Sequence, residues 1–218
     1  MQTEIRNRPA FANIRVLLES GDSLIAESDA MASMSSTVAM KAQLAGGFFN
    51  AVIRRLFGQE SMFVNEFSTY GTGEVVLTQP FPGDMECIEL NGNTILLQPG
   101  AFVACESGVK LSAGWAGFAS FFGKEGLFRL KASGTGKLWF GAYGGIFTRD
   151  VSEELTIDTG HLVAYEPTLK LKMGMAGGFF SFIFGGEGFV SKVRGQGRVY
   201  LQSRSMDGLA AWTNSHLY

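Results

Sequence analysis

The chain has 218 residues, enough for one large β domain or two smaller ones. Hydrophobic residues make up 46% of it and charged residues 17%, against about 25% charged residues in soluble domains, so less charge than usual covers the surface. The net charge of −2 and the isoelectric point near 5.7 lack the basic excess of proteins that bind nucleic acids, and the chain carries no strong nucleic-acid signal.

The N-terminal residues mix charges and precede no apolar run of signal-peptide length. The apolar stretches at 46–53 and 174–184 are shorter than the roughly 18 to 20 residues of a membrane-spanning helix. Cys87 and Cys105 lack CxxC spacing and fit buried thiols in a reducing compartment. We therefore expect a cytoplasmic protein that does not cross a membrane by itself.

Three blocks of similar sequence follow one another along the chain. Each contains a Gly/Phe-rich segment, then a Gly-containing turn that ends in Glu, then a Gly-x-Gly motif. The turn residues Glu60, Glu125 and Glu187 recur at intervals of 65 and 62 residues. A fixed period of this kind indicates a repeated supersecondary unit that packs against its own copies.

Short strands and tight turns are predicted throughout each block. Two β-rich runs flanking a polar turn with Gly precede each Gly/Phe segment, at 16–25, 88–97 and 155–163, and predict hairpins. The runs after the Gly-x-Gly motifs, at 74–77, 137–140 and 198–201, predict further strands, and the repeated glycines predict positive φ or close backbone approach. Helical periodicity is present only at 48–56, where we expect at most a short helix.

These features predict one all-β domain over 1–218, with repeats at about 14–85, 86–150 and 151–206. One repeat cannot bury its apolar face alone, so the three are expected to close on one another as a pseudo-threefold body or a continuous sandwich. Residues 207–218 lie outside the repeats and are expected to form a tail that packs on the body or on a neighbour.

The repeat blocks, together with Leu96-Leu-Gln-Pro-Gly100, give the chain a family resemblance. It resembles the altered-inheritance-of-mitochondria family, in particular uncharacterised bacterial members whose fold is placed near that of the tryptophan RNA-binding attenuator protein. The resemblance implies a double-stranded β-helix-like architecture and a tendency to form homo-oligomers. For mitochondrial members only, it implies a role in the architecture of the inner membrane. It carries over no catalytic residues, and function does not follow from fold.

The residues offer little catalytic chemistry. His161 and His216 are the two histidines, whereas a metal site of the cupin type needs a cluster of them with a carboxylate. We expect His161 to be a polar turn residue. We expect the repeated glutamates to have a structural role in turns, rather than to form a ring that binds a cation. Gly-x-Ser-x-Gly is absent. We expect no metal, no cofactor and no enzymatic activity.

Ten of the nineteen phenylalanines are concentrated in the three Gly/Phe segments. Aromatic clusters in loops need a burial partner, and the other segments, a second subunit, or a lipid or protein surface could each supply one. The predicted contact residues are Phe48, Phe49, Phe118, Phe179 and Phe180.

The sequence thus favours a non-catalytic homo-oligomeric scaffold or interaction protein that contacts partners or a membrane surface through these segments. A small-ligand or RNA-binding module is the alternative, and a metal-dependent enzyme on a cupin-like fold is a third interpretation.

Overall fold

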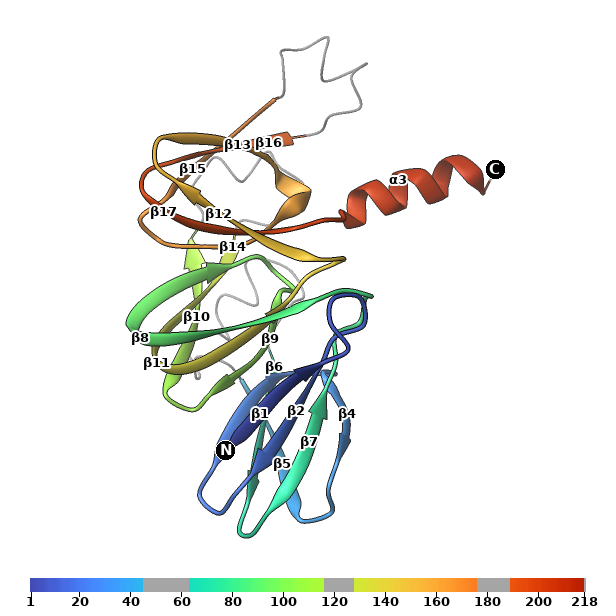
Figure 1. The fold of residues 1–218 in the computed structure, drawn as a ribbon, viewed down its shortest axis with the longest axis vertical. Helices are drawn as coiled ribbons and strands as arrows, with labels where there is room; N and C mark the ends of the chain where they lie inside the picture. The colour runs from blue at the N-terminus through green and yellow to red at the C-terminus, as the bar shows by residue number, and fades with distance from the viewer. Residues whose placement is uncertain (45–62, 116–127, 176–188, 218) are drawn as a thin grey trace.

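The computed structural model describes residues 1–44, 63–115, 128–175 and 189–217. The described chain consists of antiparallel strands, a 3-10 turn and one C-terminal helix, so the prediction of an all-β fold is confirmed. The strands form three groups that follow one another along the long axis of the molecule, with the first group at the bottom of Figure 1.

The bounds of the elements are as follows. The first group contains β1 (Gln2–Arg6), β2 (Asn13–Leu18), β3 (Ser23–Glu27), β4 (Met31–Met34), β5 (Val38–Leu44), β6 (Phe63–Thr69) and β7 (Gly73–Leu77). The second group contains β8 (Met85–Leu97), β9 (Phe102–Glu106), β10 (Val109–Trp115) and β11 (Phe128–Gly141). The third group contains β12 (Ile146–Val151), β13 (Glu154–Asp158), the 3-10 turn η2 (Thr159–His161), β14 (Leu162–Tyr165), β15 (Lys170–Met175), β16 (Phe189–Arg194) and β17 (Gly197–Gln202), and it is followed by the helix α3 (Met206–His216).

The same antiparallel pairings occur in all three groups. In the first group β7 lies between β2 and β4, and β6 lies between β3 and β5. In the third group β17 lies between β12 and β14, and β16 lies between β13 and β15. In the second group the long strands β8 and β11 pair along most of their length, with a register shift between Ser133 and Thr135. On its other side β11 pairs with β10 in its first half and with β9 in its second half, so both kinds of three-strand set recur.

The predicted hairpins at 16–25, 88–97 and 155–163 are wrong. β2 and β3 pair with different strands rather than with each other, and so do β13 and β14. Residues 88–97 lie within the single strand β8, where Gly92 takes a φ of +84°. A polar turn between two alternating runs is compatible with a hairpin and equally with a chain that passes from one sheet to another. Both structures need a reversal or bend of the chain, so the sequence pattern does not distinguish them.

Adjacent groups are joined through strand edges. β9 pairs with β3, with Ala26 opposite Ala104, and β14 pairs with β8, with Leu97 opposite Ala164. Parallel bridges also join Phe11 to Gly83 and Gly83 to Gly144. The groups therefore stack in a row, which corresponds to the continuous arrangement and not to a pseudo-threefold body.

The hydrophobic core follows this stack. Each group has its own cluster of buried residues. Side chains from the next group complete the first two clusters, and Leu96 of the second group packs against the third. Trp139 of the second group is 1% exposed and packs into the cluster of the first group. Tyr200 of the third group packs in the same way into the cluster of the second, in edge contact with Phe140.

Apart from Gly71, the glycines of the Gly-x-Gly motifs have a positive φ or leave no room for a side chain, as predicted. Gly134, Gly136 and Gly195 have φ of +122°, +134° and +127°. A Cβ on Gly73 would overlap the side chain of Val38, and one on Gly197 would lie 2.7 Å from Oγ1 of Thr168. The second glycine of each motif therefore lets β7, β11 and β17 pass closely beneath the turn that follows β4, β9 and β14.

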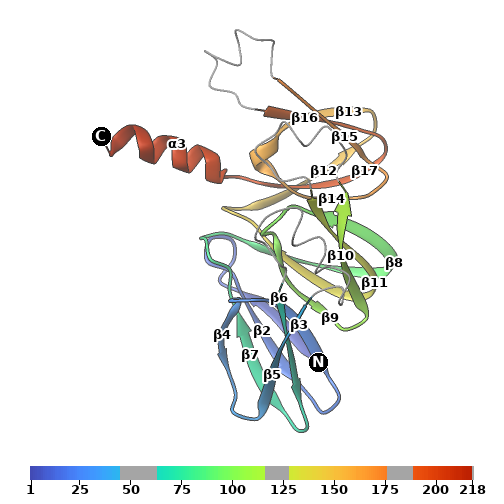
Figure 2. The same ribbon diagram turned by 180° about the vertical axis from the view of Figure 1, so that it is seen from behind.

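The tail expected at 207–218 is helical over most of its length. α3 extends sideways from the body, and none of its residues is buried (Figures 1 and 2). The expectation that the tail packs on the body is therefore wrong for this single chain, as is the expectation that helical periodicity is confined to 48–56. The segment 48–56 itself lies outside the described residues. No helix in the described ranges is long and apolar enough to cross a membrane.

Candidate functional site

The three Gly/Phe segments each link two antiparallel neighbours. The last backbone pairs before the segments are Leu44 with Phe63, Trp115 with Phe128, and Met175 with Phe189. The segments therefore leave from the ends of the pairs β5–β6, β10–β11 and β15–β16. These pairs lie in the lower, middle and upper part of the molecule, in that order (Figure 1).

The predicted contact residues all belong to these segments. Phe48, Phe49, Phe118, Phe179 and Phe180 lie outside the described residues, as do the repeated glutamates Glu60, Glu125 and Glu187. The structure thus defines the strand ends that carry the candidate surface, and the assignment of the five phenylalanines stays a prediction.

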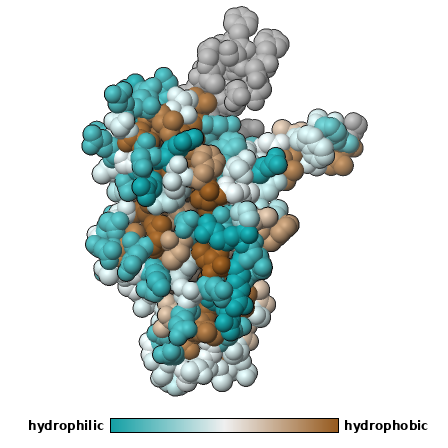
Figure 3. Space-filling model, in the orientation of Figure 1, coloured by the Kyte–Doolittle hydropathy of each residue, from teal (hydrophilic) through white to brown (hydrophobic). Residues whose placement is uncertain are grey.

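The C-terminal helix presents a second apolar surface. Ser205 caps α3, since its hydroxyl accepts a hydrogen bond from the backbone N–H of Gly208 at 3.0 Å. Met206, Leu209 and Trp212 are 49%, 42% and 62% exposed. Trp212 stacks on His216 with ring centroids 4.5 Å apart, and hydrophobic residues are visible on the projecting helix (Figure 3). The helix is thus folded with apolar side chains that its own chain does not cover.

This helix was not predicted, although the sequence contains a signal for it. Ser205 is a favourable N-cap residue directly before the helix, and Asp207 adds negative charge to its first turn. Leu209, Trp212 and His216 then follow at i, i+3 and i+7, on one face of a helix. This spacing lies outside the three repeats, from which the predicted elements were taken.

The described surface includes two shallow hollows near the features above. One, of about 110 Å³, lies at the base of α3 between Phe81, Gly100, Tyr143, Leu162 and Met206. It is smaller than the roughly 300 to 1,000 Å³ of typical ligand pockets. The other, of about 350 Å³, lies at the first group, and its lining mixes apolar residues such as Leu17 and Leu18 with the carboxylates of Glu19 and Glu74, whereas most small-molecule sites are predominantly apolar.

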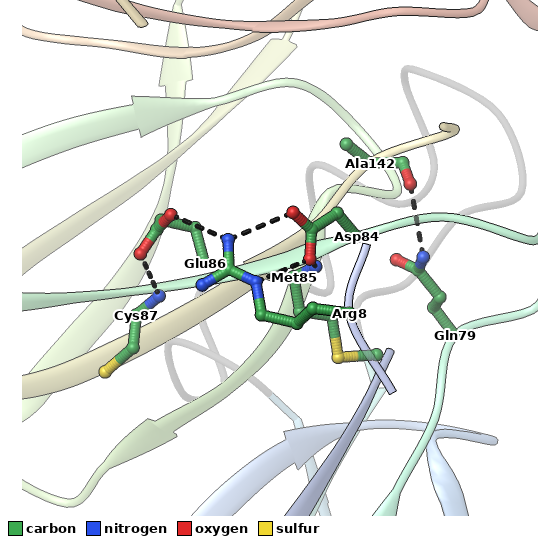
Figure 4. A network of polar contacts seen from close by, with 7 residues as sticks. All are labelled: Arg8, Gln79, Asp84, Met85, Glu86, Cys87 and Ala142. Carbon is green, nitrogen blue, oxygen red and sulfur yellow. Dashed lines mark hydrogen bonds and ion pairs between the residues drawn. The ribbon is translucent and has the colours of Figure 1, made fainter. Parts of the chain in front are cut away.

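A polar network ties the first group to the second (Figure 4). The carboxylate of Asp84 accepts hydrogen bonds from Nε of Arg8 at 2.8 Å and from Nη2 of Arg8 at 3.0 Å, and Arg8 also reaches Glu86 at 3.2 Å. The hydrogen bond to Asp84 raises the pKa of the Arg8 guanidinium. Nearby, the side-chain amide of Gln79 donates to the backbone carbonyl of Ala142 at 3.1 Å. The network fixes the junction where the chain enters the second group.

The titratable groups of the described chain show little reactive chemistry. Burial raises the pKa of Cys87 to about 11 and that of Cys105 to about 12, so both free thiols are protonated at neutral pH. His161 lies in η2, and its Nδ1 is 2.7 Å from the carbonyl oxygen of Gln202, a structural contact. Among the described residues, no group of three or more His, Cys, Asp and Glu side chains is placed to hold a metal ion.

Comparisons with known proteins cover almost the whole chain. A family model described as Mitochondrial biogenesis AIM24 matches residues 3–204, a range that includes all three strand groups and ends just before α3. An uncharacterised protein of Streptococcus pyogenes serotype M6 is 29% identical over 227 residues, covering 100% of this chain and 91% of the relative. An X-ray crystal structure of a Streptococcus pyogenes protein is similar with a TM-score of 0.81 and 26% identity, and 99% of each chain is covered.

Proposed function

Because the chain belongs to the Mitochondrial biogenesis AIM24 family, as its motifs predicted, we propose that it is a non-catalytic homo-oligomeric scaffold. In this proposal it contacts partners or a membrane surface through the Gly/Phe segments at 48–49, 118 and 179–180, and it acts in the cytoplasm. The family relationship and the all-β fold are the premises, and the contacts and the location are the proposed part.

The observation that carries the proposal is the exposed apolar face of α3. An isolated helix of 11 residues is marginal in water, and most helical stability in proteins comes from packing an apolar face. Met206, Leu209 and Trp212 are 49%, 42% and 62% exposed, so the described residues leave much of this face uncovered. Contiguous exposed apolar residues mark surfaces that contact other molecules, so a protein that works by contact accounts for this helix.

The arrangement of the Gly/Phe segments supports the same function. We take the three strand groups, with their recurring pairings, to be the structural form of the repeats in the sequence. Segments of similar apolar sequence would then leave the body at three successive levels. Such spacing suits a scaffold with several equivalent contact points, because linked weak contacts gain affinity by acting together.

The chemistry of the described residues supports a role without catalysis. A nucleophilic cysteine needs a lowered pKa, whereas burial raises the pKa of both thiols here. Two free thiols also suit a reducing compartment such as the cytoplasm.

Liposome flotation with light-scattering mass determination tests the proposal. The parent protein is compared with the variant Phe48→Ser/Phe49→Ser, and the matched control is Phe147→Ser, a 42% exposed phenylalanine on β12 outside the segments. We expect the double variant to lose vesicle binding or oligomeric mass, while Phe147→Ser keeps both. A double variant that folds and matches the parent in both readouts would refute the proposed role of the segments.

A further inference from the structure

The two junctions inside the chain are built in the same way. β9 lies against the outer edge of β3, and β14 lies against the second half of β8. At the first junction Cys105 is opposite Ile25, and at the second Tyr165 is opposite Leu96. Each junction buries the residues of the joining strand, since Cys105 is 0% and Tyr165 is 6% exposed.

The first group has the same joining strand, and among the described residues no strand pairs with its outer edge. In the joining strands β9 and β14, Cys105 pairs with Leu138 and Tyr165 pairs with Val199. Leu138 and Val199 each lie two residues after the last glycine of their Gly-x-Gly motif. By that criterion β4 is the equivalent strand and Met34 the equivalent residue, because Met34 pairs with Val75, two residues after Gly73. Met34 is 39% exposed, and the neighbouring Ser33 is exposed as well.

The third group has the matching receptor edge. In each group one residue of the receiving strand pairs with a central strand that also pairs with a third strand. These pairs are Leu24 with Phe67, Ile95 with Ala132, and Leu155 with Val193. Their central residues then pair with β5, β10 and β15, so Leu24, Ile95 and Leu155 are equivalent positions of β3, β8 and β13. β13 is therefore the equivalent of the edges that receive β9 and β14. Within the described part of the chain, β13 pairs on one side with β16 and is the end strand of its sheet.

The central parts of the two open edges carry no charge. Edge strands usually carry charges, proline or bulges that prevent pairing with another chain. β4 has the sequence Met-Ala-Ser-Met, with no charge and no proline, and its register shift against β7 resembles the shifts of the joining strands β9 and β14. β13 has Glu154 and Asp158 at its ends and the uncharged residues 155–157 between them. There Thr156 is exposed, and Leu155 is only partly buried although its equivalents Leu24 and Ile95 are 0% and 3% exposed.

We propose that β4 of one copy of this chain pairs antiparallel with β13 of a second copy. The internal junctions fix the register: Met34 lies opposite Thr156 and Ser33 lies opposite Ile157 of the second copy. The contact is head to tail, so each copy keeps one free edge and further copies extend the row. α3 leaves the body to the side in both views, away from the line of the stack (Figures 1 and 2).

This inference deepens the proposed function, because it names the contact between copies of the scaffold. It does not involve the Gly/Phe segments. The two proposals are judged by different readouts: vesicle binding of the Phe48→Ser/Phe49→Ser variant tests the segments, and the cross-linking and oligomeric mass of the β4 and β13 variants test the edge contact.

Disulfide cross-linking between two variants tests the register. Met34→Cys and Thr156→Cys are prepared as separate proteins in a Cys87→Ser background, because Cys87 is partly exposed whereas Cys105 is buried. Directly opposite residues of an antiparallel pair lie within the range that a disulfide spans. Under mild oxidation we expect a dimer in the mixture and none in either protein alone. A dimer of Met34→Cys with itself, or no dimer in the mixture, would overturn the proposal.

Light scattering with a charge on the edge is the second test. Met34→Lys places a cation on β4, and Thr148→Lys places one on β12, an exposed end strand that the proposal leaves unpaired. We expect the mass of Met34→Lys to fall to the single-chain value of 23.5 kDa, with the parent and Thr148→Lys remaining larger. Equal masses for Met34→Lys and the parent would overturn the proposal, provided that circular dichroism shows both folded.

Discussion

Arg8 and Asp84 are 76 residues apart in the sequence, and they form a two-point ion pair across the junction of the first and second groups. The side chain of Asp84 is 6% exposed and that of Arg8 is 41% exposed. The backbone of Asp84 also bonds to the segment that links the second group to the third: its N–H donates to the carbonyl oxygen of Gly144, and its carbonyl oxygen accepts from the N–H of Ala142. Asp84 therefore ties Arg8 of the first group to the segment that leads into the third.

Replacing Arg8 by Ala should destabilise the protein, since it leaves the buried carboxylate of Asp84 without its cation. We expect the free energy of unfolding to fall by about 2 kcal/mol, a moderate value because Arg8 is partly exposed to water. Urea denaturation measures the change. The control is Arg6→Ala, whose exposed pair with Glu4 should contribute less than about 0.5 kcal/mol. Equal effects of the two substitutions would show that the Asp84 junction adds no stability.

Gly83→Ala should be among the most damaging single changes in the chain. A Cβ at position 83 would overlap the backbone carbonyl oxygen of Ala142, and backbone cannot move aside as a flexible side chain can. We expect a loss of about 3 kcal/mol or more in the free energy of unfolding, measured by urea denaturation. Gly71→Ala serves as the control, because nothing lies within 4 Å of a Cβ there. If Gly83→Ala were as stable as Gly71→Ala, the close approach of the two segments that link the groups, at Gly83 and at Ala142, would be incorrect.

The buried thiol of Cys105 should make stability depend on alkaline pH. Burial raises its pKa from the ordinary 9.0 to about 12, so the folded protein holds the proton more tightly than the unfolded chain. The resulting stability is fully present below about pH 9 and is lost as the pH rises from there toward 12.

A comparison of the parent with Cys105→Ala by urea denaturation at about pH 8 and pH 10 measures this effect. We expect the parent to lose about 1 kcal/mol more than the variant between the two conditions. Cys87 and Tyr200, whose pKa values burial also raises, are present in both proteins and do not affect the difference. Identical losses would mean that the Cys105 thiol ionises as readily in the folded as in the unfolded state.

Removal of residues 206–218 should leave the stability of the body almost unchanged. No residue of α3 is buried, so its deletion uncovers little core. We expect a change within about 0.5 kcal/mol in urea denaturation. The contrasting variant is Trp139→Ala, which empties a 1% exposed core position and should cost about 3 to 5 kcal/mol. A large loss on removing α3 would mean that the helix packs on the body in solution.

The local features of the fold could be predicted from the sequence. Alternating runs after each Gly-x-Gly motif are strands, and the glycines at 73, 136 and 197 stand where a side chain would collide or where φ is positive. These properties depend on a few neighbouring residues, so a short stretch of sequence contains the information.

Long-range features could not be predicted in the same way. The turn at 91–93 reads as a hairpin, yet β8 continues through it, because the partner strand β11 bends at the same level. The contact of Arg8 with Asp84 joins residues whose proximity depends on the completed stack. The stack itself follows from pairings such as that of β9 with β3, which leave no local pattern in either strand.

The central claim, that this is a homo-oligomeric scaffold, is tested most directly by the mass of the parent protein in solution. Light scattering coupled to size-exclusion chromatography gives that mass without reference to a standard. The account predicts an average mass above the 23.5 kDa of one chain that rises with protein concentration, as head-to-tail association requires. A constant mass of 23.5 kDa at every concentration would contradict it.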